Sequence, residues 1–125
     1  MQFFDPIITA PEAEVLTTLH VEIITENEMG KRTAVTPALF FMPHCDLPLY
    51  NNLLWANWRP ECLCNVALLG NSLDFYHRST ASSKLQQRAW YVFAAHALAS
   101  ETMLQGTFAP SEVRSVISMI IAHLH

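Results

Sequence analysis

Two short apolar segments without charge constrain the fold of this chain most strongly. Residues 38–42 lie between Pro37 and Pro43, and residues 65–69 are followed directly by Gly70. A run that is apolar on both faces is typical of a strand buried between two layers of helices. We therefore expect two central strands in a layered fold.

A helix is predicted between these two strands. Asp46 is a suitable N-cap residue, Pro48 suits the first turn, and Pro60 stops the helix. Apolar and aromatic residues keep helical spacing on one face, namely Leu47, Tyr50, Leu54 and Trp58. Because a helical crossover joins parallel strands, this order favours an α/β fold with a parallel sheet.

Weaker signals precede this unit. Pro11 and the acidic residues after it open a helix that reaches about Leu19. Residues 21–25 are rich in β-branched types and predict a short strand, and residues 27–32 form a polar turn. The N-terminal part thus adds a helix and a strand to the same domain.

The last third of the chain has a helical pattern of its own. We expect one helix from Ser82 or Ser83 through residue 104 and a second helix from Ser111. The second helix carries a single apolar stripe formed by Val113, Val116, Ile117, Ile120, Ile121 and Leu124. No strand is expected after Leu69. The stripe has to cover an exposed strand edge of the domain or pack on another chain.

The composition excludes several classes of protein. Apolar types make up 51% of the 125 residues, so the chain can bury a core and is not disordered throughout. The net charge of −4 argues against direct nucleic-acid binding. Residues 89–99 form the longest uncharged apolar run, well short of the roughly 20 residues that span a bilayer. With no signal peptide visible, we expect a cytoplasmic location, with the nucleus as a further option, and no membrane partner.

Polar residues follow each predicted strand and are candidates for a binding site. His44 and Cys45 come after the first strand, and Asn71 and Ser72 come after the second. Ligands of open α/β sheets bind outside the carboxyl ends of the strands. Cys45 lies near a helix N-terminus, which lowers a thiol pKa, and His44 beside it suits a base or a ligand. The alternative is that both pairs form ordinary turns.

Two further groups of residues are candidates for binding a metal, a haem or another ligand. The Cys62 and Cys64 pair is spaced more tightly than a zinc motif, and no second pair follows, so we expect no metal. Haem ligation by His44 or Cys45 is open in principle, but no spacing demands it, and the cofactor stays unknown. The predicted crossover helix is rich in asparagine and tryptophan, and its amides either fix loops or hold a ligand.

Several of these segments together resemble one protein family. The blocks Phe-Met-Pro-His-Cys at residues 41–45 and Leu-Tyr-Asn-Asn-Leu-Leu-Trp-Ala-Asn-Trp at residues 49–58 are long and specific. With residues 5–6, 14–16, 26–32 and 70–72, they look like the sensitivity-to-red-light-reduced (SRR)-like family. The resemblance covers roughly residues 4–76, and the tail is unmatched.

The resemblance implies a fold and a cellular role. It implies a truncated Rossmann-like, three-layer core over residues 1–78, and residues 79–125 are expected to form a helical extension. Family members usually carry an upstream strand with a glycine turn, and this chain begins too late to include it. The family is linked to light signalling, circadian clock gene expression and the regulation of haem biosynthesis.

The leading hypothesis is a non-enzymatic regulatory protein that binds protein partners, with a homodimer through the C-terminal helices as one option. Its surface would comprise His44, Cys45, Tyr50, Asn51, Asn57, Asn71 and Ser72. The rival hypothesis is a small-molecule or haem sensor, or an enzyme, that uses the crevice at the strand ends. A third alternative is a non-functional fragment of the family domain.

Overall fold

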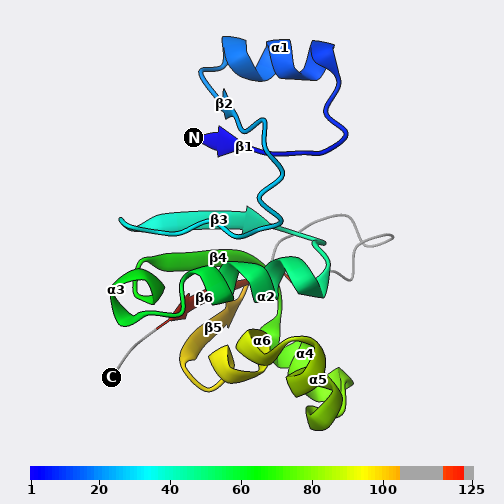
Figure 1. Cartoon of the computed structure of the whole chain (residues 1–125), viewed down its shortest axis with the longest axis vertical. Helices are drawn as coiled ribbons and strands as arrows, with labels where there is room; N and C mark the ends of the chain where they lie inside the picture. The colour runs from blue at the N-terminus through cyan, green and yellow to red at the C-terminus, as the bar shows by residue number, and fades with distance from the viewer. Residues whose placement is uncertain (105–116, 123–125) are drawn as a thin grey trace.

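The computed structural model describes residues 1–104 and 117–122, and its main feature is a four-stranded sheet (Figure 1). The strands in spatial order are β3 (Ala38–Met42), β4 (Val66–Asn71), β6 (Ile117–Ala122) and β5 (Ala99–Met103). β3 and β4 are parallel, from Ala38 opposite Val66 to Met42 opposite Gly70. β6 is antiparallel to both of its neighbours. The α/β class is confirmed, whereas the sheet is mixed and not purely parallel.

The connection between β3 and β4 is the predicted helical crossover. α2 (Leu47–Ala56) begins after Asp46, carries Pro48 in its first turn and ends before Pro60. The short α3 (Pro60–Leu63) follows, with Pro60 in its own first turn. Proline suits a first turn because the missing N–H has no partner there in any case. Both predicted strands and the helix between them are therefore confirmed.

The hydrophobic core lies on one face of this sheet. Alternate residues of β4 are buried, and so is Ile120 of β6. They pack against buried residues of α2 and of α6 (Trp90–Ala95), which include Tyr50, Leu53, Leu54 and Val92. The face of the sheet that packs on α2 and α6 therefore holds the core, and the core fixes the positions of the ends of β3 and β4.

The opposite face of β3 is exposed, which corrects the prediction of a strand buried on both faces. Leu39 is 62% exposed and Phe41 is 67% exposed, while Ala38, Phe40 and Met42 are half-buried and pack on the core. The sequence of the strand has no polar residue on either face, so its pattern could not show which face would lack a covering layer. The three-layer core is not seen around this strand.

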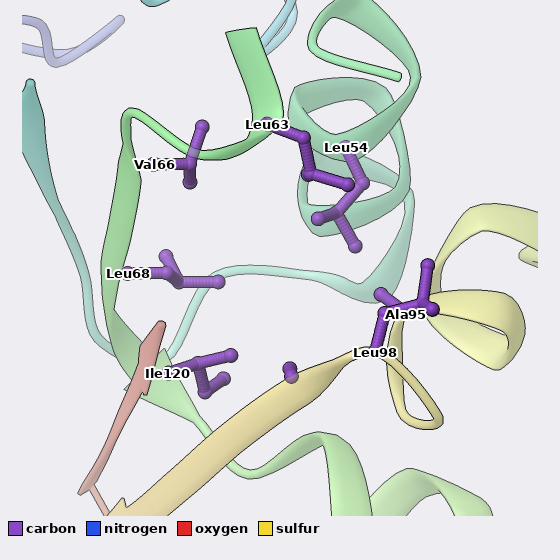
Figure 2. Close-up of a pocket in the computed structure, with 8 residues that line it drawn as sticks. Leu54, Leu63, Val66, Leu68, Ala95, Leu98 and Ile120 are labelled. Carbon is purple, nitrogen blue, oxygen red and sulfur yellow. The ribbon is translucent and has the colours of Figure 1, made fainter. Parts of the chain in front are cut away.

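A gap of about 10 Å³ lies inside the core, enclosed by apolar side chains that include Leu54, Leu63, Leu68 and Ile120 (Figure 2). This volume corresponds to about one water molecule, and a buried water needs polar partners that this lining does not offer. The gap is a packing defect and is too small for a ligand.

The predicted pair of C-terminal helices is wrong in the described residues. The chain forms α4 (Leu73–Ser79), α5 (Ser82–Arg88) and α6, and then the strands β5 and β6. Ala89 separates α5 from α6 because its backbone is not helical, with φ of −154° and ψ of 65°. Residues 105–116 and 123–125, on which part of the second helix was predicted, lie outside the described residues.

The strand β6 replaces the predicted apolar helical stripe for a tertiary reason. Its isoleucines at 117, 120 and 121 are β-branched and favour strands, and β4 and β5 offer backbone partners on both sides. The C-terminal segment therefore extends the sheet beyond β4. The prediction that it covers an exposed strand edge is wrong for the described residues, because β3 keeps a free edge. A homodimer stays a prediction, although the described C-terminal residues form β5 and β6 and not the helices expected to mediate it.

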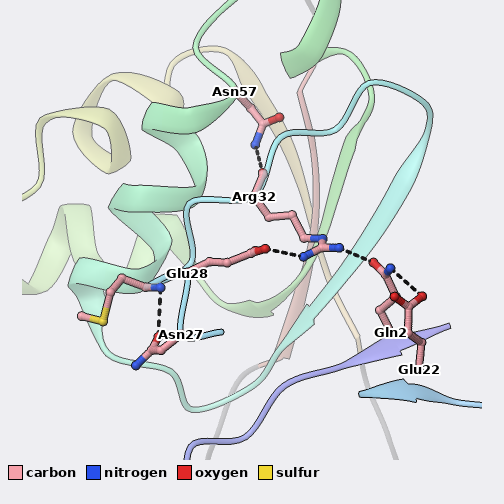
Figure 3. Close-up of polar contacts among 7 residues, drawn as sticks. Gln2, Glu22, Asn27, Glu28, Arg32 and Asn57 are labelled. Carbon is pink, nitrogen blue, oxygen red and sulfur yellow. Dashed lines mark hydrogen bonds and ion pairs between the residues drawn. The ribbon is translucent and has the colours of Figure 1, made fainter. Parts of the chain in front are cut away.

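The N-terminal part forms a small parallel unit of its own. β1 (Gln2–Phe3) and β2 (Glu22–Ile23) pair in parallel and are joined by α1 (Ala10–Thr18). Only β1 was not predicted, because two residues carry no periodicity. Arg32 connects this unit to the following loop, since its guanidinium donates to Gln2 at 2.6 Å and to Glu28 at 2.7 Å (Figure 3).

Among the described residues, no helix combines the length and the apolarity that crossing a bilayer requires.

Candidate functional site

The polar residues after β3 and β4 meet at one point of the molecule. The backbone N–H of His44 donates to Oδ1 of Asn71 at 3.0 Å. The Nδ2 group of Asn71 donates in return to the carbonyl oxygen of Cys45 at 3.2 Å. This juxtaposition follows from parallel pairing, which places both carboxyl ends on one edge. We refer to His44, Cys45, Asn71 and Ser72 together as the corner, and their predicted proximity is confirmed.

Tyr50 supports the corner from inside the core. Its side chain is fully buried, and its hydroxyl donates to the carbonyl oxygen of Met42 and accepts from the N–H of Asn71 at 3.0 Å. In a parallel ladder the next rung would join these same two backbone groups. The hydroxyl therefore bridges the strands where they end and ties both to α2. Burial raises the pKa of Tyr50 to about 12, because the phenolate would be desolvated there.

Gly70 makes room for this tyrosine. A Cβ atom at position 70 would lie 2.8 Å from the Tyr50 hydroxyl and 3.0 Å from the Met42 carbonyl oxygen. Both distances are shorter than van der Waals contact, so any side chain would push Tyr50 out of its position. The role of this glycine is therefore close packing within β4.

Ser72 begins α4 at the corner. Its hydroxyl oxygen accepts from the N–H of Phe75 at 3.0 Å, which satisfies one free donor of the helix N-terminus. The Asn71 amide also donates to the Tyr76 hydroxyl at 3.0 Å, so the first turn of α4 is held against the strand end. Sequence reasoning missed α4, although Ser72 followed by Asp74 is an ordinary N-terminal signal.

His44 is the exposed member of the corner. Its backbone φ is +59°, in the left-handed region that few residues other than glycine adopt. The bond from its N–H to Asn71 stabilises this conformation. The imidazole thus projects from a turn whose backbone is fixed by the neighbouring strand.

Cys45 does not have the properties expected of an activated thiol. The side chain is half-buried, and desolvation raises the pKa of the thiol, with a further increase from the negative charge of Asp46. The helix N-terminus was predicted to lower it. That prediction is wrong, because burial and a neighbouring carboxylate both disfavour the thiolate.

The remaining two predicted site residues lie away from the corner and fix loops. Asn57 is fully buried, and its Nδ2 donates to the carbonyl of Arg32 at 2.8 Å (Figure 3). Its Nδ2 also donates to the carbonyl of Leu53 at 2.8 Å, and its Oδ1 accepts from the N–H of Ala34 at 2.7 Å. Asn51 accepts from the N–H of Tyr91 at 2.9 Å and so caps the first turn of α6. In the structure Asn57 thus fixes a loop and Asn51 fixes the start of a helix.

A histidine pair that the sequence did not reveal joins α4 to α6. The rings of His77 and His96 stack with centroids 4.2 Å apart, and His96 lies 3.3 Å from Asp74. His77 lies in α4 and His96 directly follows α6, and the two are far apart in the chain, so no local spacing could have indicated them. Among the described residues, no group of three or more His, Cys, Asp or Glu side chains is arranged to hold a metal.

A second depression lies on the surface at the other ends of the same strands. Its lining comes from Pro37 and Leu39 on one side and from Cys64 and Ala67 on the other. Neither this depression nor the core gap involves a residue of the corner.

Comparison with known proteins gives one consistent result. A family model described as the SRR1 domain matches residues 1–120, beyond the range of 4–76 expected from the quoted segments. The chain is 43% identical over 81 residues to "Protein SENSITIVITY TO RED LIGHT REDUCED 1" of Arabidopsis thaliana, covering 65% of this chain and 30% of that protein. It is 41% identical over 90 residues to the "SRR1-like protein" of Mus musculus, covering 71% and 36%.

The chain spans only about a third of the length of these curated relatives. No solved structure matches it.

Proposed function

The chain belongs to the SRR1 domain family, and on that premise we propose that it is an intracellular regulatory protein that acts by binding a protein partner. The binding surface is centred on the His44 turn. Cys45 and Asn71 border this turn. The buried Tyr50 hydroxyl holds the two strand ends together, and Ser72 caps the following helix α4. Asn51 and Asn57 hold the surrounding loops in place.

One observation supports this proposal above the others, namely the way in which the corner uses its polar groups. The amide of Asn71 makes three hydrogen bonds within the corner and to Tyr76, and the Tyr50 hydroxyl makes two more. These groups are occupied in fixing the backbone, so they are not free to take part in a reaction. The imidazole of His44 stays exposed on a turn with little freedom. An exposed side chain on a fixed backbone suits recognition, because little backbone entropy is lost on binding.

The rival proposal of an enzyme or sensor at the same strand ends has less support. It depended on a Cys45 thiolate, and the pKa of that thiol is raised. Neither the core gap nor the surface depression described above involves a residue of the corner, so neither of them supports a haem or small-molecule site there.

The finer roles expected of the family belong to this proposal as well. We propose a place in light signalling, in clock gene expression or in the regulation of haem biosynthesis. The name of the Arabidopsis relative refers to red light and supports the role in light signalling. We also propose a cytoplasmic location with access to the nucleus.

The test is a comparison of two histidine variants. His20 and His44 are both exposed and both have φ of +59°, so His20→Ala is a matched control for His44→Ala. Proteins captured from a cell extract are quantified by mass spectrometry for wild type and both variants, and circular dichroism checks the fold. We expect His44→Ala to lose at least one partner that His20→Ala keeps. If both folded variants capture the same proteins as wild type, the proposed surface is wrong.

A further inference from the structure

The free edge of β3 is a second surface of interest, separate from the exposed side chain of the corner. β3 stands first in the strand order, so β4 is its only neighbour within the described part of the sheet. The N–H of Ala38 donates towards β4, to Asn65 at 2.8 Å. Because alternate residues of a parallel strand face opposite sides, the N–H and C=O groups of Leu39 and Phe41 point outwards. Among the described residues these groups have no strand partner, so they form a row of unpaired donors and acceptors.

Nothing in the sequence protects this edge. Natural edge strands carry charges, proline or a bulge that prevent pairing with another chain. Here no Lys, Arg, Asp or Glu occurs between Arg32 and Asp46, and both prolines lie outside the strand. The opposite edge of the sheet is different, because β5 carries Glu101 together with Ser100 and Thr102. Of the two edges of the four-stranded sheet in the described residues, the β3 edge is the one without a charged residue.

The N-terminal unit lies on the side of this edge. In Figure 1, β1 is placed between β2 and β3, and β1 and β3 run in the same direction. The bond from Arg32 to Gln2 anchors β1 on this side. The strands β1 and β2 are two residues long, and a sheet of two strands is marginal alone. An additional strand beside β3 would therefore meet this unit as well.

We infer that the free edge of β3 binds one extended strand of a partner protein. The bound segment is uncharged, is about as long as β3 and is rich in β-branched residues, because it has to pair with outward backbone groups and cover Leu39 and Phe41. A second copy of the chain is disfavoured as the occupant, since the β1–α1–β2 unit stands where the body of that copy would lie. This inference goes beyond the proposed function, which concerns the corner.

The experiment uses a synthetic peptide with a Thr-Val-Ile-Val-Thr core and lysines at both ends. Amide hydrogen exchange of the full chain is followed by NMR with and without the peptide. We expect the peptide to slow exchange at Leu39 and Phe41 by about tenfold or more. The variant Phe41→Lys places a charge on the edge and should abolish this effect, whereas Thr102→Lys on β5 should not. Leu39→Lys serves as a second variant if Phe41→Lys does not fold.

Three results would overturn the inference. Saturating peptide could leave Leu39 and Phe41 unprotected, or it could protect them equally in Phe41→Lys. Sedimentation could instead show a dimer of the wild type that Phe41→Lys dissociates, which would make a second copy the occupant. A change in partner capture by His44→Ala tests only the proposed function of the corner. It does not test the inference that the β3 edge binds a strand.

Discussion

The backbone N–H of His44 donates to the side-chain oxygen of Asn71 at 3.0 Å, so the turn after β3 is held by the last residue of β4. Neither strand could fix this turn alone. Asn71 supplies an acceptor for one residue of the turn and a donor for the next. The Tyr50 hydroxyl joins the two strands just below. The backbone that carries the exposed imidazole is therefore positioned by long-range contacts and not by its own sequence neighbours.

The close packing of Gly70 on Tyr50 predicts a coupled pair of substitutions. Gly70→Ala should destabilise the protein by about 2–3 kcal/mol, because the new methyl group overlaps the hydroxyl and ring of Tyr50. Tyr50→Phe should cost about 1–3 kcal/mol by leaving two backbone groups without their partner. Urea denaturation of both variants and of the double variant measures the coupling. The double variant should lose less than the sum, and strict additivity would contradict the contact.

The raised pKa of Tyr50 predicts a loss of stability in alkaline solution. The folded protein keeps the proton of the Tyr50 hydroxyl up to a pH of about 12, while the unfolded chain releases this proton near pH 10.0. Between these values the unfolded state binds fewer protons, so the free energy of unfolding falls as pH rises, by about 2–3 kcal/mol from this group. Urea denaturation between pH 9 and 12 checks this, with Tyr50→Phe as the control. An equal slope in both proteins would show that Tyr50 is not responsible.

Cys45 is expected to react slowly with thiol reagents. Burial and Asp46 raise the pKa of its thiol, whereas Cys64 is exposed on the surface. Alkylation at neutral pH, followed by peptide mass spectrometry, should label Cys64 before Cys45. Preferential labelling of Cys45 would indicate an activated thiolate and would restore the enzyme or sensor proposal.

Asn52 in α2 and Asn57 directly after it are predicted to differ in their contribution to stability. Asn57→Ala should lower the free energy of unfolding by about 3 kcal/mol, because it leaves the buried groups of Ala34, Arg32 and Leu53 unpaired. Asn52→Ala removes one exposed bond to Met29 and should cost less than about 1 kcal/mol. Chemical denaturation compares the two variants. Similar losses would show that Asn57 is not the main support of the loop.

The central unit could be predicted from the sequence because its signals are local. Proline and a capping residue mark the ends of α2, and the two uncharged runs mark β3 and β4. A helix between two strands then requires parallel pairing, which places His44 beside Asn71. The position of the candidate site follows from these few steps.

The C-terminal strands, the exposed face of β3 and the properties of Cys45 depend on contacts between distant parts of the chain. Residues 117–122 carry apolar residues compatible with a helix, and only the backbone partners offered by β4 and β5 decide for a strand. The exposure of Leu39 and Phe41 depends on which layers the chain builds around β3. The pKa of Cys45 was predicted from the helix N-terminus alone, and burial outweighs that effect.

The amide exchange of His44 tests the central claim most directly, namely that the ends of β3 and β4 form one rigid corner. In the wild type, NMR should show this amide protected, although the residue lies in an exposed turn. Asn71→Ala should reduce the protection by about tenfold or more while the amides within β4 remain slow. A His44 amide that exchanges in the wild type at the rate of an unstructured peptide would contradict the account.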